Sequence, residues 1–104
     1  MSLIAENVSA ASNYETNRDK PNSNLGYMSY QVNFSGLDAT DGIISTEYSN
    51  DNVNWEEVPG LTETVATASE VVNFNINAIN HKFYRIKWVS GSNTAGTFDI
   101  YVSS

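Results

Sequence analysis

The sequence predicts an all-β fold: an antiparallel β-sandwich or barrel, with a sandwich of about seven or eight strands favoured. Three observations carry this prediction. Apolar and polar residues alternate along several short segments, as they do in strands with one buried face. Turn-forming dipeptides separate these segments at short intervals. No segment combines a 3.6-residue apolar stripe with helix-capping residues, so helices are not expected apart from a short helix or turn at 77–80.

Alternation is clearest in five segments, and we predict a strand in each of them. They are residues 27–35, 42–49, 71–77, 83–89 and 97–103. The apolar positions of these segments are expected to face inward and form the core, chiefly Met28, Tyr30, Val32, Phe34, Val72, Phe74, Ile76, Tyr84, Ile86, Trp88, Phe98 and Ile100. In 42–49, Ser45 and Glu47 fall on the opposite, solvent side. Weaker alternation marks three further candidate strands at 3–10, 55–58 and 62–66.

Turns are predicted where glycine or Asn-Asp pairs interrupt the alternation. The turn dipeptides are Ser35-Gly36, Asp41-Gly42, Asn50-Asp51, Pro59-Gly60, Ser90-Gly91 and Ala95-Gly96. Pro59-Gly60 is expected to separate 55–58 from 62–66. Trp55 follows the Asn50-Asp51 turn, and we expect its ring to fill one end of the sandwich.

Residues 11–26 interrupt the strand pattern, and 11–24 are almost wholly polar. One interpretation is a long surface loop. The other is an arm that orders on a partner or a neighbouring subunit, because unstructured loops of this length are uncommon and often functional. The whole chain, 1–104, is expected to form a single domain that contains this loop or arm.

Charge and composition exclude several classes of partner. Twelve acidic residues against five basic ones give a net charge of −7. Such a surface repels nucleic acid and anionic membranes, which are bound largely through Lys and Arg. The chain has no cysteine, so disulfides and thiolate chemistry are absent. The N-terminus resembles no signal peptide, and no apolar run approaches the ~20 residues of a membrane helix. We therefore expect a short product that is made and kept soluble.

No arrangement of residues predicts catalysis, a cofactor or a metal site. His81 is the only histidine and lies in no catalytic motif. Glu56 and Glu57 would point to opposite faces of a strand, which does not suit a pair of catalytic carboxylates. The prediction is therefore a protein that is not an enzyme, with no catalytic, cofactor-binding or metal-binding residues.

A Ca²⁺ site remains an alternative, because two predicted loops carry oxygen ligands of the kind that calcium binds. One loop holds Asp38 and Asp41, and the other holds Asp51 among three asparagines. These loops lack the EF-hand pattern, and Asp and Asn side chains also cap turns without any metal.

Four residues are candidate surface contacts. Tyr27 and Tyr101 are predicted to face outward from their strands, whereas Trp88 shares the inward face with Tyr84 and Ile86. Tyr14 and Arg18 lie in the predicted loop or arm. The candidate contacts are Tyr14, Arg18, Tyr27 and Tyr101.

Two segments of the C-terminal half resemble a known family. Residues 48–60, YSNDNVNWEEVPG, are similar to its hairpin pattern SNDxxNWxxVxG. Residues 83–89, FYRIKWV, followed by 91–102, GSNTAGTFDIYV, are similar to its pattern YRxIRV…GSxTGTLxIY. Both patterns are found in small jelly-roll or discoidin-like β-sandwich domains of bacteriophage virion proteins and of some bacterial surface proteins. The first 26 residues carry no such likeness.

The resemblance implies a jelly-roll-like sandwich and a structural role in a virus particle. Such a protein would be a capsid decoration, a spike or a fibre-associated component, assembled in the host cytoplasm and localised to the virion. It would form a homotrimer or homopentamer and bind other virion proteins, with 11–24 contacting a neighbouring subunit or the capsid. The alternative is a carbohydrate- or surface-binding module that uses an exposed aromatic strip at Tyr27 and Tyr101 with adjacent Asn and Asp residues.

Overall fold

The computed structural model describes residues 2–16, 28–76 and 81–103, and these form eight β-strands and no helix. The strands are β1 (Ser2–Ser9), β2 (Tyr14–Glu15), β3 (Met28–Ser35), β4 (Gly42–Ser49), β5 (Glu56–Val65), β6 (Glu70–Ile76), β7 (Phe83–Val89) and β8 (Thr97–Ser103). This confirms the all-β prediction. The described residues contain no helix that is long and apolar enough to span a membrane.

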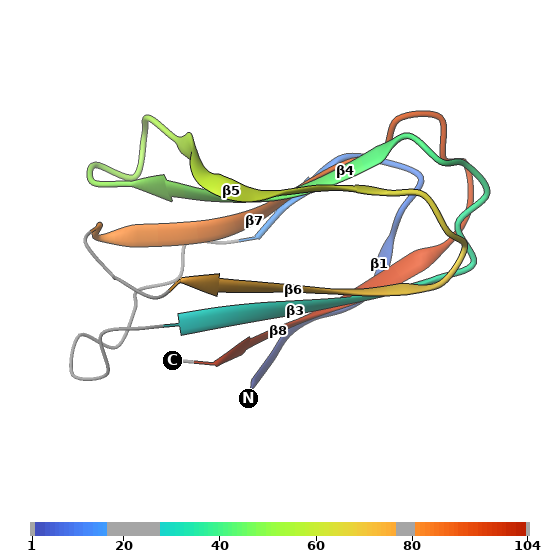
Figure 1. The fold of residues 1–104 in the computed structure, drawn as a ribbon, viewed down its shortest axis with the longest axis horizontal. Coiled ribbons are helices and arrows are strands. Elements are labelled where there is room, and N and C mark those ends of the chain that lie inside the picture. The colour runs from blue at the N-terminus through green and yellow to red at the C-terminus, as the bar shows by residue number, and fades with distance from the viewer. Residues whose placement is uncertain (1, 17–27, 77–80, 104) are drawn as a thin grey trace.

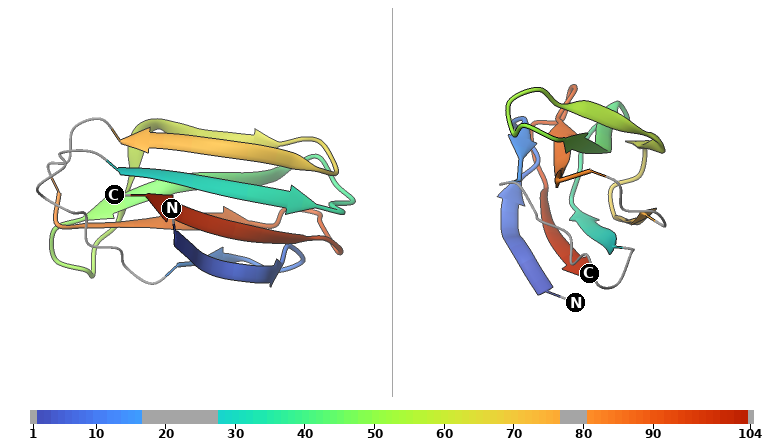
Figure 2. Two further views of the ribbon diagram at one scale, coloured as in Figure 1. Left: turned by 90° about the horizontal axis from the view of Figure 1, so that it is seen from below. Right: turned by 90° about the vertical axis from the view of Figure 1, so that its left-hand side faces the viewer.

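The strands form two antiparallel sheets of four strands each, stacked as two layers (Figure 1). Sheet A has the order β1-β8-β3-β6, and sheet B has the order β2-β7-β4-β5. This is the strand order of a jelly roll, in which successive strands alternate between the two sheets except at the β4–β5 hairpin. The predicted antiparallel, jelly-roll-like sandwich is therefore confirmed. The start of β1 lies beside the end of β8, since Ser2 pairs with Val102 (Figure 2).

The core lies between the two sheets and contains every residue predicted to form it. None of those residues has more than 5% of its surface exposed. The ring of Trp88 is fully buried and packs on the rings of Phe34 and Phe98, with centroid distances of 4.9 and 5.8 Å. The core also includes Ala5, Ala10, Leu37, Ile44 and Val65.

The prediction of two strands separated by a turn at Pro59-Gly60 is wrong, because β5 runs without interruption through both residues. Its pairing with β4 shifts register between Ser45 and Glu47, which marks a β-bulge, and Gly60 has a φ of 81°. β5 is an edge strand, so the missing N–H of Pro59 need not cost a ladder hydrogen bond. The proline and glycine therefore bend an edge strand instead of ending it.

The predicted polar loop at 11–26 contains a short strand near its start. Tyr14 and Glu15 form β2, which pairs with Trp88 and Lys87 of β7. Thr16 extends this contact, because its N–H donates to the Ile86 carbonyl and its Oγ1 accepts from the Ile86 N–H, both at 3.0 Å. The rest of the segment, with Arg18 and Tyr27, lies outside the described residues, and so does the short helix or turn predicted at 77–80.

The outer face of sheet B is more buried than the alternation predicts. Ser45 and Glu47 point away from the core, yet they are only 3% and 6% exposed. Arg85 is the cross-strand neighbour of Glu47, and Trp55 lies over the Arg85 guanidinium, whose carbon is 4.2 Å from the ring centroid. Trp55 therefore covers part of this face and does not fill the end of the sandwich as predicted.

Candidate binding surface

The outer face of sheet A carries mostly uncharged polar side chains, with one valine and one carboxylate among them, and we call it the amide face. Alternate residues of β3, β6 and β8 point away from the core and form it. Its members are Ser29, Gln31, Asn33, Val71, Asn73, Asn75, Asp99, Tyr101 and Ser103, with Leu3 of β1 beside them.

One row of this face crosses all four strands of the sheet. Tyr101 is the cross-strand neighbour of Leu3 on one side and of Gln31 on the other, and Gln31 in turn lies beside Asn73. Neighbouring strands are about 4.8 Å apart, so this row extends about 14 Å across the sheet. Tyr101 is partly exposed and Asn73 is exposed. The row therefore presents an aromatic ring followed by two amides to solvent.

The amide face has hydrogen-bonding capacity but little charge. Each Asn or Gln side chain carries two donor hydrogens and one acceptor oxygen. The Gln31 Nε2 donates to the Asn33 Oδ1 at 3.0 Å, which holds these two amides in a fixed relation. Asp99 adds one carboxylate, which accepts from the Asn7 N–H at 2.8 Å. The described strands place no Lys or Arg on this face. Such a surface suits a neutral ligand with many hydroxyl groups.

The structure describes two of the four predicted contact residues, Tyr101 and Tyr14. Tyr101 lies on the amide face, as predicted, and Tyr14 lies on β2 at the edge of the other sheet. Its ring points inward and meets Phe98 edge-on, with a centroid distance of 5.8 Å and an interplanar angle of 70°. β2 pairs with β7, so one side of the Tyr14 ring packs against the core while the side chain stays partly exposed, and its role as a surface contact stays a prediction. Arg18 and Tyr27 lie outside the described residues.

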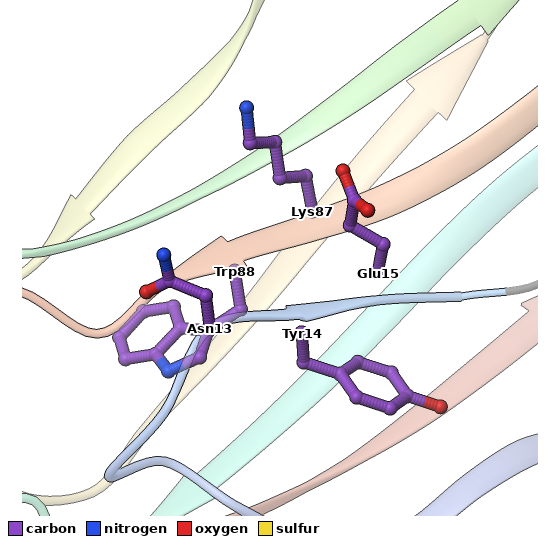
Figure 3. Close-up of a pocket in the computed structure, with 5 residues that line it drawn as sticks. All are labelled: Asn13, Tyr14, Glu15, Lys87 and Trp88. Carbon is purple, nitrogen blue, oxygen red and sulfur yellow. The ribbon is translucent and has the colours of Figure 1, made fainter. Parts of the chain in front are cut away.

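A small hollow beside β2 is a second place where a ligand could be sought. It has a volume of about 220 Å³ and is lined by Asn13, Tyr14, Glu15, Lys87 and Trp88 (Figure 3). Figure 3 shows Glu15 and Lys87 on one side of the strands and the Tyr14 ring on the other. Asn13 Oδ1 accepts from the Ser90 N–H at 2.9 Å, so this amide already holds the β7–β8 loop. We therefore assign the hollow no ligand.

Ion pairs occupy the outer face of sheet B. The Arg85 Nε lies 2.8 Å from Glu47 Oε1, and its Nη2 lies 2.9 Å from Glu15 Oε2. Lys87 Nζ is 3.9 Å from the other oxygen of Glu47. Because the guanidinium also stacks under Trp55, its donors and its face are engaged within the protein. This cluster holds β2, β4 and β7 together and leaves little for a ligand.

His81 has a structural environment. Its ring stacks on Tyr48 with a centroid distance of 3.8 Å, and its Nδ1 lies 3.2 Å from the Asn50 Nδ2. Asn50 Oδ1 also accepts from the Lys82 N–H at 3.0 Å. These contacts join the β4–β5 turn to the start of β7. Within 2–16, 28–76 and 81–103, no three His, Asp or Glu side chains are grouped so that they could hold a metal ion.

The loop carboxylates that raised the calcium alternative cap loops. Asp51 accepts from the Ser49 hydroxyl, from the Val53 and Asn54 N–H groups and from the Asn54 side chain, at 2.8–2.9 Å. Asp38 accepts from the N–H and the hydroxyl of Thr94, and Asp41 accepts in the same way from Ser92. The structure thus favours turn capping, the other interpretation of these residues.

These hydrogen bonds predict a loss of stability in acid. Donors to the ionised carboxylates lower the pKa of Asp38, Asp41 and Asp51, most strongly that of Asp51, where the Asn54 N–H is the largest cause. A pKa lowered by folding stabilises the fold above the unfolded value of about 3.9, and this stabilisation is lost as the pH falls below that value. The thermal unfolding midpoint is therefore expected to fall between about pH 5 and pH 2.

Circular dichroism melts across this pH range measure the effect. Asp51→Asn is expected to lower the midpoint at neutral pH and to flatten its dependence on pH. The control is Glu57→Gln, which removes one charge from an exposed position of β5. Equal pH dependence in wild type and Asp51→Asn would show that this carboxylate does not couple protonation to folding.

Comparisons with known proteins identify no family for this chain. No family model matches it, and no curated protein matches it in sequence. A solved structure described as "CBM4 structure and function" is similar in fold, with 16% sequence identity and a TM-score of 0.49. The match covers 88% of this chain and 58% of that one, so this chain is similar to little more than half of that structure. At this level of similarity the likeness assigns no function, and the function must be argued from the surface itself.

Proposed function

We propose that this chain is a non-catalytic carbohydrate-binding domain and that its amide face binds neutral glycans. The observation that carries the proposal is the row in which Tyr101, Gln31 and Asn73 lie side by side across β8, β3 and β6. It combines an aromatic ring with amides on one exposed sheet face.

The chemistry of this row matches that of a sugar. Each sugar hydroxyl both donates and accepts a hydrogen bond, and so does each amide side chain. A tyrosine ring offers an apolar face to the C–H groups of a pyranose and a hydroxyl at its edge. The net charge of −7 disfavours acidic glycans, because like charges repel at short range. A neutral polysaccharide is therefore the expected class of ligand.

A structural role in a bacteriophage particle stays a prediction from the sequence resemblance. No contact of the described residues tests it, and the same holds for a virion location and for a trimer or pentamer. The expectation that the chain is not an enzyme is part of the present proposal.

Affinity electrophoresis in gels containing neutral polysaccharides, together with a glycan array, tests the proposal. Wild type is expected to be retarded by at least one neutral glycan. Tyr101→Ala is expected to weaken that binding by about tenfold, and Asn73→Ala by several-fold. The matched control is Thr62→Ala, an exposed strand residue of the other sheet, which is expected to bind like wild type. Melting curves would confirm that each variant is folded.

Two outcomes would count against the proposal. Silence of the wild type on all neutral glycans would refute carbohydrate binding, and co-sedimentation with virus particles in that case would favour the virion role. Glycan binding that survives in Tyr101→Ala and Asn73→Ala would show that the site lies elsewhere on the protein.

A further inference from the structure

A sandwich of two open sheets has four edge strands, which here are β1 and β6 in sheet A and β2 and β5 in sheet B. An edge strand exposes a row of backbone N–H and C=O groups that another chain can pair with. Proteins usually protect such edges with bulges, prolines, charges or very short strands. The four edges of this molecule differ sharply in this respect.

Three of the edges carry such protection. β1 is interrupted by two register shifts, and Asn7 within it has a φ of 50°. β2 has only two residues. β5 contains Pro59, Gly60 and a register shift, and it carries Glu56, Glu57 and Glu63.

The fourth edge, β6, has almost none. All of its residues, Glu70 to Ile76, pair with β3 in one unbroken register. Its sequence, EVVNFNI, contains no Pro, Gly, Lys or Arg, and its one charge is at the first residue. Short β-prone segments of low charge without proline are the ones that pair readily with other strands. β6 lies along a flank of the sandwich, and no described strand lies beyond it in sheet A (Figure 2).

We propose that β6 pairs antiparallel with β6 of a second copy of this chain, about a two-fold axis at Asn73. In this register Val72 lies opposite Phe74 of the second copy, and both face the core side of their sheets. Because residues directly opposite each other share a face, the exposed faces of the two copies also match. Asn73 meets its own equivalent at the axis, where two amides can each donate and accept.

Charge favours β6 over the other long edge strand, β5, for contact between two copies of this chain. Two molecules of net charge −7 repel each other, so they meet best where each has the fewest carboxylates. In the proposed register each Glu70 faces Ile76, and the two Glu70 positions lie about 20 Å apart along the strands. That distance exceeds the screening length of about 8 Å at physiological salt. Pairing through β5 would place Glu56, Glu57 and Glu63 of both copies on adjoining strands. Because β5 contacts β6, pairing through β6 leaves these carboxylates near the interface but in the other sheet.

The dimer would have a continuous eight-stranded sheet in which the amide faces of the two copies adjoin. Its existence does not depend on the proposed carbohydrate binding, which each copy could perform alone. A contact confined to one strand pair is at the small end of protein interfaces, so the dimer is expected to be reversible. A two-fold contact of this kind closes at two copies, unlike the trimer or pentamer implied by the resemblance.

Sedimentation equilibrium over a wide range of protein concentration tests the dimer. Wild type is expected to show a reversible monomer–dimer equilibrium. Asn73→Lys puts like charges opposite each other at the axis and is expected to lower the association constant by about tenfold or more, as is Asn73→Asp. A mixture of these two variants is expected to restore the dimer, because opposite charges then face each other. Thr64→Lys on the β5 edge, the matched control, is expected to behave like wild type.

Each result decides the proposal. A wild type that stays monomeric at the highest concentration overturns it, as does a trimer or pentamer. A dimer that is insensitive to Asn73→Lys, or that Thr64→Lys disrupts equally, would place the interface elsewhere. Recovery in the mixed sample supports pairing of β6 with its own copy, whereas failure of the mixture to recover would exclude the two-fold register at Asn73.

Discussion

Trp88→Ala is expected to destabilise the fold by about 3–5 kcal/mol, the range for removing a large aromatic side chain from a core. Trp88 has no exposed surface and packs against Phe34 and Phe98. Its Nε1 donates to the Ala10 carbonyl at 3.2 Å, so the ring also holds the segment between β1 and β2. A domain of this size has a total stability of about 5–15 kcal/mol. The substitution therefore removes a large share of it.

The fit around this ring is tight as well as apolar. A Cβ placed on Gly42 would lie 2.1 Å from the Cη2 of Trp88, so the start of β4 requires glycine for close approach. Gly42 has no side chain that could move into the cavity left by alanine. This is why we expect a value within the range above and not below it.

Urea denaturation followed by circular dichroism measures this loss. Trp55→Ala is the matched control, because that tryptophan lies on the surface over Arg85, and its removal is expected to cost about 1 kcal/mol or less. If Trp88→Ala does not fold, Trp88→Phe is expected to fold with an intermediate loss. Equal effects at the two tryptophans would contradict the assignment of Trp88 to the core.

Glu47→Ala is expected to cost about 2–3 kcal/mol, since it leaves a largely buried guanidinium without its main partner. The side chains of Glu47 and Arg85 are only 8% and 18% exposed, and they meet at 2.8 Å. Glu47 also lies 3.9 Å from Lys87 Nζ, so one carboxylate serves two cations on β7. Its loss removes charge compensation from the middle of sheet B.

Glu15→Ala provides the comparison, because Glu15 binds the same guanidinium at 2.9 Å but is 47% exposed. Solvent screens this pair, and its removal is expected to cost about 0–1 kcal/mol. A double-mutant cycle with Arg85→Ala, measured by urea denaturation, separates the two couplings. A larger coupling energy for Glu15 than for Glu47 would contradict the argument from burial.

Alternation predicted the core well because burial of one strand face requires only a local pattern. Phe34, Phe98 and Trp88 come from three distant segments, yet each was placed inward by its own neighbours in sequence. The same local rule placed Tyr101 outward. It failed for β5, where Pro59-Gly60 looks like a turn, because only the position of a strand at a sheet edge makes a proline tolerable.

The candidate binding surface was only partly predictable. The outward asparagines of β6 and the outward Tyr101 could each be identified from the sequence. Their assembly into one row depends on the strand order β8-β3-β6 and on the register of each pair. Tyr14 shows a similar dependence, since a tyrosine in a polar segment packs its ring against the core once β2 pairs with β7.

By itself, the sequence determined that this chain forms an antiparallel β-sandwich and which residues form most of its core, because both follow from a two-residue period that neighbouring residues display. Only the tertiary structure decided which outward residues meet, which strands lie at the sheet edges and which charges are buried. These properties depend on register and strand order, which arise from pairing between residues far apart in the chain. The amide face, the edge position of β6 and the buried Glu47 all belong to that second group.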